Sequence, residues 1–203
     1  MERSNAVTFL GNPLTLIGNE LKPGDPAPDA TVIKQDLTPV NIHDYKGHVL
    51  LISVVPSIDT GVCSAQTKKF NEETSKLPDS VKVITVSMDL PFAQKRFCGA
   101  ENIDKIEVLS DHREGAFGQA YGTLVKELRI LSRAVFVVDP QGTIRYVEYV
   151  PEIATHPNYD AALQAVRRKL PFLIGLSKAQ RRNLSKAGYA RSSFVRQALN
   201  LAE

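Results

Sequence analysis

The chain has 203 residues, which is enough for one domain with a buried core and at most a small additional element. Hydrophobic residues make up 43% of it, and no apolar run reaches the ~18 residues of a membrane span, so we expect a globular protein without a membrane segment. The net charge of +3 is unevenly placed: residues 171–203 carry six basic residues and one acidic residue, whereas 1–170 carry 19 and 21. A nucleic-acid surface on the main body is therefore not expected.

The two cysteines and four histidines limit the kinds of site that the chain can contain. Neither cysteine belongs to a C-x-x-C pair, and the histidines lack metal-ligand spacing, so we expect neither a disulfide scaffold nor a structural zinc. Met1–Asn5 does not begin a basic segment followed by a long apolar one, so we expect no secretory signal and a cytoplasmic location.

The first third of the chain predicts short strands followed by one apolar strand. Val7–Ile17 predicts a β-hairpin, because two strand-like segments flank the turn signal Gly11-Asn12-Pro13. The segment Lys22–Asp29 contains three prolines and is expected to be extended. Further strands are predicted at Thr31–Ile33, Val40–Ile42 and Val49–Val55.

The segment after the apolar strand predicts a partly exposed helix from Ser64 to about Lys76. Ala65, Phe70 and Leu77 are expected to form its inner face, and most of its other residues, Gln66 among them, are polar.

Strands and helices alternate in the remainder. Asp89 is expected to cap a helix over Pro91–Phe97, which carries Cys98 at its end and stops at Gly99. The other predicted strands are Val81–Met88, Ile106–Leu109, Ala134–Val138 and Thr143–Tyr149, and the other predicted helices are Glu114–Tyr121 and Tyr159–Leu170. This order predicts an α/β or α+β sheet with helices on both faces.

The candidate reactive residue is Cys63, at the point where the apolar strand passes into the helix. Free backbone N–H groups and the positive end of the helix dipole stabilise a thiolate there. Pro56, Thr60 and Cys63 form the pattern P-x-x-x-T-x-x-C, in which the threonine hydroxyl can accept from the thiol and donate to a substrate oxygen. Arg133, directly before an apolar strand, is a candidate for a second positive field. The alternative is an inert, buried cysteine.

The stretch Pro56–Cys63 resembles the active-site signature of peroxiredoxins, and the longer stretch Val54–Thr67 is similar to the thiol peroxidase subfamily in particular. The resemblance runs from about residue 1 to residue 170 and includes the N-terminal hairpin and the stretch Leu131–Asp139. It implies a thioredoxin-like fold and the reduction of hydroperoxides by Cys63.

The resemblance also implies roles for the neighbouring residues. Thr60 and Arg133 would hydrogen-bond the peroxide and hold the thiolate, and Pro56 would close the pocket against water. The second cysteine, Cys98, would be a packing residue by position alone. In the thiol peroxidase subfamily, however, a cysteine on the following helix resolves the sulfenic acid of the first, and the separation of 35 residues between Cys63 and Cys98 fits this.

A disulfide between the two cysteines requires Cα atoms roughly 4.4–6.8 Å apart. A cysteine at a helix start and one at a helix end are not expected to be that close, so we predict local unwinding around both during turnover. The resemblance implies thioredoxin as the reductant and favours a homodimer, and the reaction needs no metal, haem or nucleotide cofactor.

The basic tail lies beyond the usual end of the family, so we predict a peroxiredoxin domain at 1–170 and a helical extension of unknown role at 171–203. Ser192 or Ser193 could cap a last helix, Phe194–Leu201. From Leu176 the tail faintly resembles ribbon-helix-helix or mobilisation proteins, although a basic extension without DNA binding is favoured. A different class of function stays open, namely a peroxide-sensing redox or interaction protein that uses the same cysteine pair.

Overall fold

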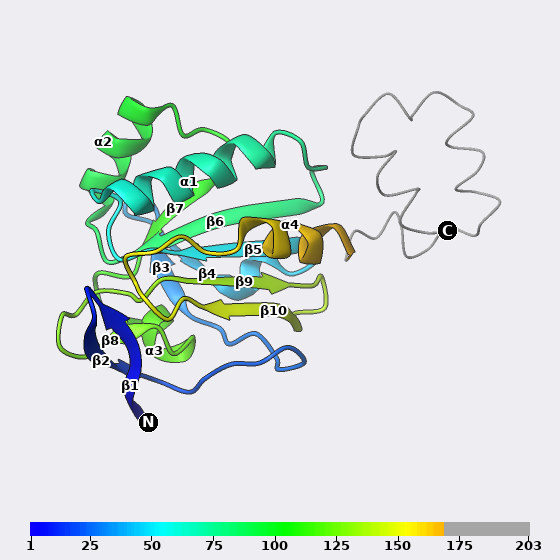
Figure 1. Cartoon of the computed structure of the whole chain (residues 1–203). Helices are drawn as coiled ribbons and strands as arrows, with labels where there is room; N and C mark the ends of the chain where they lie inside the picture. Colours follow the sequence, from blue (N-terminus) through cyan, green and yellow to red (C-terminus); the bar gives the residue numbers. More distant parts are fainter. Residues whose placement is uncertain (169–203) are drawn as a thin grey trace, which may run out of the picture.

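A seven-stranded sheet with the order β10-β9-β5-β6-β7-β3-β4 forms the centre of the computed structural model, which describes residues 1–168 (Figure 1). Its strands are β3 (Thr31–Ile33), β4 (Pro39–Asn41), β5 (Val49–Val54), β6 (Val81–Ser87), β7 (Glu107–Ser110), β9 (Ala134–Val138) and β10 (Ile144–Tyr149). Strands β5, β6 and β7 are parallel, and β9 pairs antiparallel with β5. This pairing brings the end of β5 next to the start of β9, where Val54 lies opposite Ala134.

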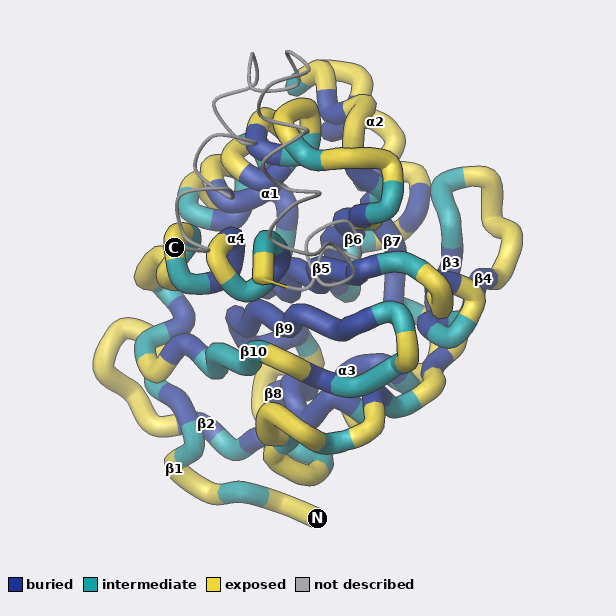
Figure 2. The backbone as a smooth tube through the Cα atoms, turned by 90° about the vertical axis from the view of Figure 1, so that its right-hand side faces the viewer, coloured by how far each residue is buried: buried dark blue, intermediate teal, exposed yellow. Residues whose placement is uncertain are grey.

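Helices cover both faces of this sheet, as predicted. On one face lie α1 (Gly61–Thr74), α2 (Pro91–Glu101) and α4 (Tyr159–Arg168), and on the other α3 (Ala116–Ala120) (Figure 1). Strand β5 is buried along its whole length (Figure 2), and its side chains alternate between the two faces. Leu51 packs in the cluster that includes α1 and α4, whereas Ile52 packs with Phe117 of α3. A continuous apolar strand is therefore what a sheet covered on both sides requires.

The N-terminal hairpin, β1 (Glu2–Phe9) and β2 (Asn12–Ile17), forms a second sheet with β8 (Leu124–Val125). The hairpin was predicted, but its predicted turn at Gly11-Asn12-Pro13 is wrong. Leu10 and Gly11 form the turn, with φ angles of 51° and 78°, and Asn12 already begins β2. Positive φ at both central residues is typical of the two-residue turn that matches the twist of a hairpin.

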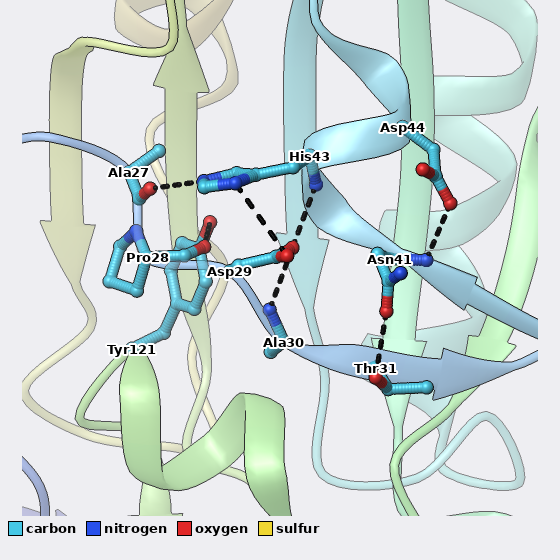
Figure 3. Close-up of polar contacts among 9 residues, drawn as sticks. All are labelled: Ala27, Pro28, Asp29, Ala30, Thr31, Asn41, His43, Asp44 and Tyr121. Atoms are coloured by element: carbon cyan, nitrogen blue, oxygen red, sulfur yellow. Dashed lines mark hydrogen bonds and ion pairs between the residues drawn. The ribbon is translucent and has the colours of Figure 1, made fainter.

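The proline-rich segment ahead of β3 is extended only in part: Lys22–Asp25 form a turn, closed by the Asp25 N–H on the Lys22 carbonyl oxygen at 3.1 Å, and the residues after Pro26 are extended, as predicted. Polar contacts fix these later residues in place (Figure 3). The Asp29 carboxylate accepts the backbone N–H of His43 at 3.0 Å, and its other oxygen lies 3.6 Å from His43 Nδ1. His43 Nε2 lies 3.0 Å from the carbonyl oxygen of Ala27, and the Tyr121 hydroxyl donates to that of Pro28 at 3.0 Å. These bonds join the segment to the short helix η1 (Ile42–Tyr45) and to the end of α3.

Two predicted helix boundaries are wrong. Helix α1 begins at Gly61, three residues earlier than Ser64, so Cys63 lies inside its first turn. Helix α2 does not stop at Gly99 but continues to Glu101 and ends on Asn102, whose φ of 54° is left-handed. Asparagine tolerates this conformation better than most residues, which is why it can replace a terminating glycine.

Helix α4 begins at Tyr159, as predicted, and Arg168 is the last described residue. The predicted extension at 171–203 and its helix Phe194–Leu201 lie outside the described residues, and the predicted division of the chain at residue 170 stays a prediction. Among the helices of 1–168, none combines the length and the apolar character needed to cross a membrane.

The buried carboxylate of Asp111 generates a prediction about stability. It is 3% exposed and accepts the backbone N–H groups of Phe117 and Gly118 in α3. Burial raises the pKa of Asp111 from 3.8 to about 6, although the N–H bonds act in the opposite direction. Because the folded state binds this proton more tightly, the contribution of Asp111 to stability is complete below pH 3.8 and is lost as the pH rises through about 6.

We therefore expect the free energy of unfolding of the wild type, relative to Asp111→Asn, to fall by up to ~3 kcal/mol between pH 4 and pH 7. Urea unfolding of both proteins at several pH values measures this difference. Curves that stay parallel over the whole range would contradict the assignment.

Candidate active site

The loop between β5 and α1 is fixed in place before it reaches Cys63. Pro56 in this loop is buried. The carboxylate of Asp89 accepts the Ser57 hydroxyl at 2.7 Å and the backbone N–H of Ile58 at 2.8 Å. The sequence predicts that Asp89 caps α2, and this prediction is wrong. The N-cap is Leu90, without a side-chain cap, because the carboxylate is turned to the loop instead.

Cys63 is the third residue of α1 and is fully buried. Thr60 is the N-cap of this helix, with extended backbone, yet its hydroxyl makes no cap hydrogen bond. The hydroxyl oxygen lies 2.7 Å from Cys63 Sγ instead. No side chain therefore caps the backbone N–H groups of the first turn, and the threonine hydroxyl contacts the sulfur instead.

The guanidinium group of Arg133 reaches the same sulfur from β9's N-terminal side. The side chain is 1% exposed, and its Nη2 lies 3.2 Å from Cys63 Sγ. Its Nε donates to the carbonyl oxygen of Ile153 at 2.8 Å and its Nη1 to Gln66 Oε1 at 2.6 Å. No carboxylate of the described residues pairs with it. The Cys63 sulfur is therefore the contacting group that can carry the negative charge that a buried cation requires.

Gln66 is a site residue that the sequence analysis missed. It was grouped with the polar, solvated residues of α1, but it is fully buried one turn after Cys63. Its Nε2 donates to Ser53 Oγ on β5 at 2.8 Å, which leaves Oε1 facing Arg133. The buried face of α1 consists of Cys63, Gln66, Thr67, Phe70 and Glu73, whereas the predicted inner residue Ala65 is exposed. A glutamine at helical spacing from a candidate cysteine was the available signal.

The charges of Arg133 and Cys63 influence the hydroxyl of Tyr159, at the start of α4. Burial is the main cause that raises the pKa of Tyr159, the Arg133 charge opposes this, and Cys63 adds to it. The ring packs edge-on against Phe70 of α1 with centroids 5.5 Å apart. Helix α4 thus packs against α1 beside the site.

Cys98 has different surroundings from Cys63. It lies in the last turn of α2, is 8% exposed, and accepts a hydrogen bond from Gln35 Nε2 at 3.2 Å. Burial raises the pKa of the Cys98 thiol, and the Gln35 contact only partly opposes it. Both cysteines are free thiols. The structure therefore brings Thr60 and Arg133 onto Cys63, with Pro56 buried in the same loop, and leaves Cys98 with a separate neutral partner.

Comparison with known proteins identifies the family to which the chain belongs. The family model described as Redoxin matches residues 22–163. A thiol peroxidase of Halalkalibacterium halodurans is 56% identical over 165 residues, which cover 81% of this chain and 99% of that protein. The thiol peroxidase of Bacillus subtilis is 56% identical over 161 residues, covering 79% and 96%. The chain belongs to the redoxin family and, within it, to the thiol peroxidases.

A solved structure confirms the fold of this thiol peroxidase. A peroxiredoxin-like protein from Aquifex aeolicus superimposes with a TM-score of 0.77 at 46% identity, covering 82% of this chain and 98% of that one. A thiol peroxidase from Chromobacterium violaceum, at 19% identity and a TM-score of 0.71, has the same fold. The thioredoxin-like fold is thus confirmed. The chain is a peroxiredoxin-type peroxidase, for which the substrate is a peroxide and the reductant a thiol.

The hydroxyl of Thr60 generates a prediction about reactivity. Thr60→Val keeps the side-chain shape but removes the hydroxyl that lies 2.7 Å from the sulfur. A hydrogen bond to a charged group is worth ~1.5–3 kcal/mol, so we expect the second-order rate of peroxide oxidation of Cys63 to fall by roughly 10- to 100-fold. Rapid mixing of reduced protein with peroxide, followed by thiol alkylation and mass spectrometry, measures this rate.

Thr67→Val is the matched control, because the Thr67 hydroxyl donates to the carbonyl oxygen of Cys63, at 2.9 Å, and not to its sulfur. Equal rate losses in the two variants would show that the Thr60 contact with sulfur has no special part.

Proposed function

We propose that this enzyme reduces hydrogen peroxide and organic hydroperoxides in a cycle that passes through a sulfenic acid on Cys63 and a Cys63–Cys98 disulfide, and that thioredoxin reduces the disulfide. The observation that carries the proposal is the contact between the Arg133 guanidinium and the Cys63 sulfur. A buried cation without a carboxylate partner favours the thiolate, which is the nucleophilic form of cysteine.

In the first step the Cys63 thiolate attacks one peroxide oxygen and the O–O bond breaks. The sulfur is oxidised to the sulfenic acid, and the leaving hydroxide or alkoxide takes up a proton to become water or an alcohol. Thr60 Oγ1 and Arg133 Nη2 both contact the sulfur, so a peroxide that approaches it lies within reach of both donors. Their hydrogen bonds stabilise the charge that moves from sulfur to the leaving oxygen. Pro56, buried in the adjoining loop, limits the access of water.

In the second step Cys98 attacks the sulfenic sulfur, the S–S bond forms and water leaves. The raised pKa of the Cys98 thiol keeps it protonated and unreactive until it leaves its place against Gln35. The two sulfurs occupy opposite kinds of helix end, since Cys63 lies in the first turn of α1 and Cys98 in the last turn of α2. We expect bond formation to require both ends to open, and helix ends are the parts of a helix that fray most readily.

In the third step a dithiol reductant exchanges with the disulfide and returns both thiols. Thioredoxin as this reductant and a homodimeric assembly are parts of the proposal that rest on the family resemblance. Sedimentation velocity of the reduced and oxidised protein tests the dimer. The cytoplasmic location that the sequence predicts stays a prediction, and it agrees with a cycle that depends on a pool of reducing thiols.

The two cysteines should have separable effects on catalysis. We expect Cys63→Ser to abolish NADPH consumption in an assay with thioredoxin, thioredoxin reductase and a hydroperoxide. Cys98→Ser should also lose turnover, because no resolving thiol remains, yet it should still consume about one peroxide per protein molecule. Full activity of Cys63→Ser would refute the proposal, and full thioredoxin-dependent turnover of Cys98→Ser would refute the disulfide step.

The conformational part of the cycle has a distinct signature. We expect amide hydrogen exchange to become faster in residues 60–66 and 91–102 when the reduced protein is converted to the disulfide form. The hairpin strands β1 and β2 serve as an internal control and should exchange alike in both forms. Identical exchange over both cysteine-bearing segments would mean that the disulfide forms without unwinding.

A further inference from the structure

The turn that follows β10 is held on the N-terminal hairpin by backbone hydrogen bonds, from Thr8 N–H to the Pro151 carbonyl oxygen at 2.7 Å and from Ile153 N–H to the Thr8 carbonyl oxygen at 2.8 Å, and by the carboxylate of Glu152. Glu152 accepts the hydroxyl of Thr8 at 2.9 Å and the backbone N–H groups of Leu10 and Gly11, each at 3.1 Å. It also accepts the N–H of Ala154 at 3.0 Å. These hydrogen bonds lower the pKa of Glu152 to about 2, the Ala154 and Gly11 bonds being the largest causes. The carboxylate is therefore ionised whenever the enzyme works near neutral pH.

The hairpin tip has an unusual residue at the place where it meets this carboxylate. Leu10 is 73% exposed and has a φ of 51°, a left-handed conformation that an ordinary side chain rarely adopts. The two-residue hairpin turn requires this conformation, and in it the N–H groups of Leu10 and Gly11 both donate to the same carboxylate.

The residue after Glu152 connects the hairpin to the active site. The side chain of Ile153 is 1% exposed and packs in the hydrophobic cluster of the hairpin, with Val7, Leu14, Leu16 and Val125. Its backbone N–H donates to the carbonyl oxygen of Thr8 at 2.8 Å. Its own carbonyl oxygen accepts Arg133 Nε at 2.8 Å. Figure 1 shows the segment between β10 and α4 running beside the hairpin.

We propose that the N-terminal hairpin is part of the catalytic apparatus, and that Glu152 is a positioning residue which, by locking its turn onto the hairpin tip, places the Ile153 carbonyl so that Arg133 points at Cys63. The inference rests on the proposed role of Arg133 in peroxide reduction. Arg133 is held on one side by Gln66 from α1 and on the other by this carbonyl, so loss of either anchor lets the guanidinium turn away from the sulfur. A misplacement of ~1 Å in a positioned group can cost about 100-fold in rate.

The test compares Glu152→Ala with Glu127→Ala. Glu127 also binds the hairpin through its carboxylate, since both oxygens lie 3.0 Å from the N–H of Thr15, but it has no contact with the 151–154 turn. We expect Glu152→Ala to lower the second-order rate of peroxide oxidation of Cys63 by roughly 10- to 100-fold. The thiolate absorbance that Cys63→Ser removes should fall as well, and Glu127→Ala should match the wild type in both measurements. Thr8→Val, which removes one hydroxyl from the carboxylate without changing shape, should give a smaller loss of the same kind.

A double-mutant cycle with Arg133→Gln separates the inference from the proposed function. If Glu152 acts through Arg133, Glu152→Ala should cause no further loss of rate in the Arg133→Gln background. An equal loss in both backgrounds, or wild-type rates for Glu152→Ala and Thr8→Val when both are folded by urea titration, would overturn the positioning role while leaving the function of Arg133 in place. A wild-type rate for Arg133→Gln would instead overturn the proposed function, and the inference with it.

Discussion

The contact between one buried guanidinium group and one sulfur atom is the constraint on which the rest of the site depends. Burying the Arg133 charge is costly unless a negative charge or several acceptors meet it, and the described residues offer it only an amide oxygen, a carbonyl oxygen and Cys63. The surrounding elements can be understood as supports for that contact. Arg133 lies directly before β9, Cys63 and Gln66 both lie on α1, and the carbonyl oxygen of Ile153 comes from the turn after β10.

The two cysteines illustrate how the same side chain acquires two characters from its neighbours. Cys63 is surrounded by a cation, a hydroxyl and a helix N-terminus, all of which favour negative charge on sulfur. Cys98 has burial and one amide donor, so the neutral thiol is favoured. In the proposed cycle this difference sets the order of events, because Cys63 can attack the peroxide before Cys98 becomes able to attack the sulfenic acid.

The sequence predicted the parts of the fold whose signals are local. Strand β5 is apolar except for Ser53, and Pro56, Thr60 and Cys63 lie within eight residues of one another, so both the strand and the cysteine motif could be identified from neighbouring residues. The role of Gln66 could not be identified in this way. A polar residue among lysines and glutamates indicates a solvated helix face unless its partner is known, and the partner of Gln66, Arg133, is 67 residues away. The prediction for Asp89 was wrong for a related reason. Its position in the sequence predicts a helix cap, and only the fold shows that the loop after β5 donates hydrogen bonds to its carboxylate. The hairpin turn was misplaced because Glu152, which favours it, comes from the far end of the domain.

The end of α2 links the thermal stability of the protein to the turnover of the proposed cycle. The helix terminates on Asn102 in a left-handed conformation, where glycine would be under less strain, and Cys98 lies in the same final turn. A firmer end to this helix would raise the thermal stability of the resting enzyme, but in the proposed cycle it would also hold Cys98 away from the sulfenic acid. In that cycle, stability and turnover oppose each other at one position.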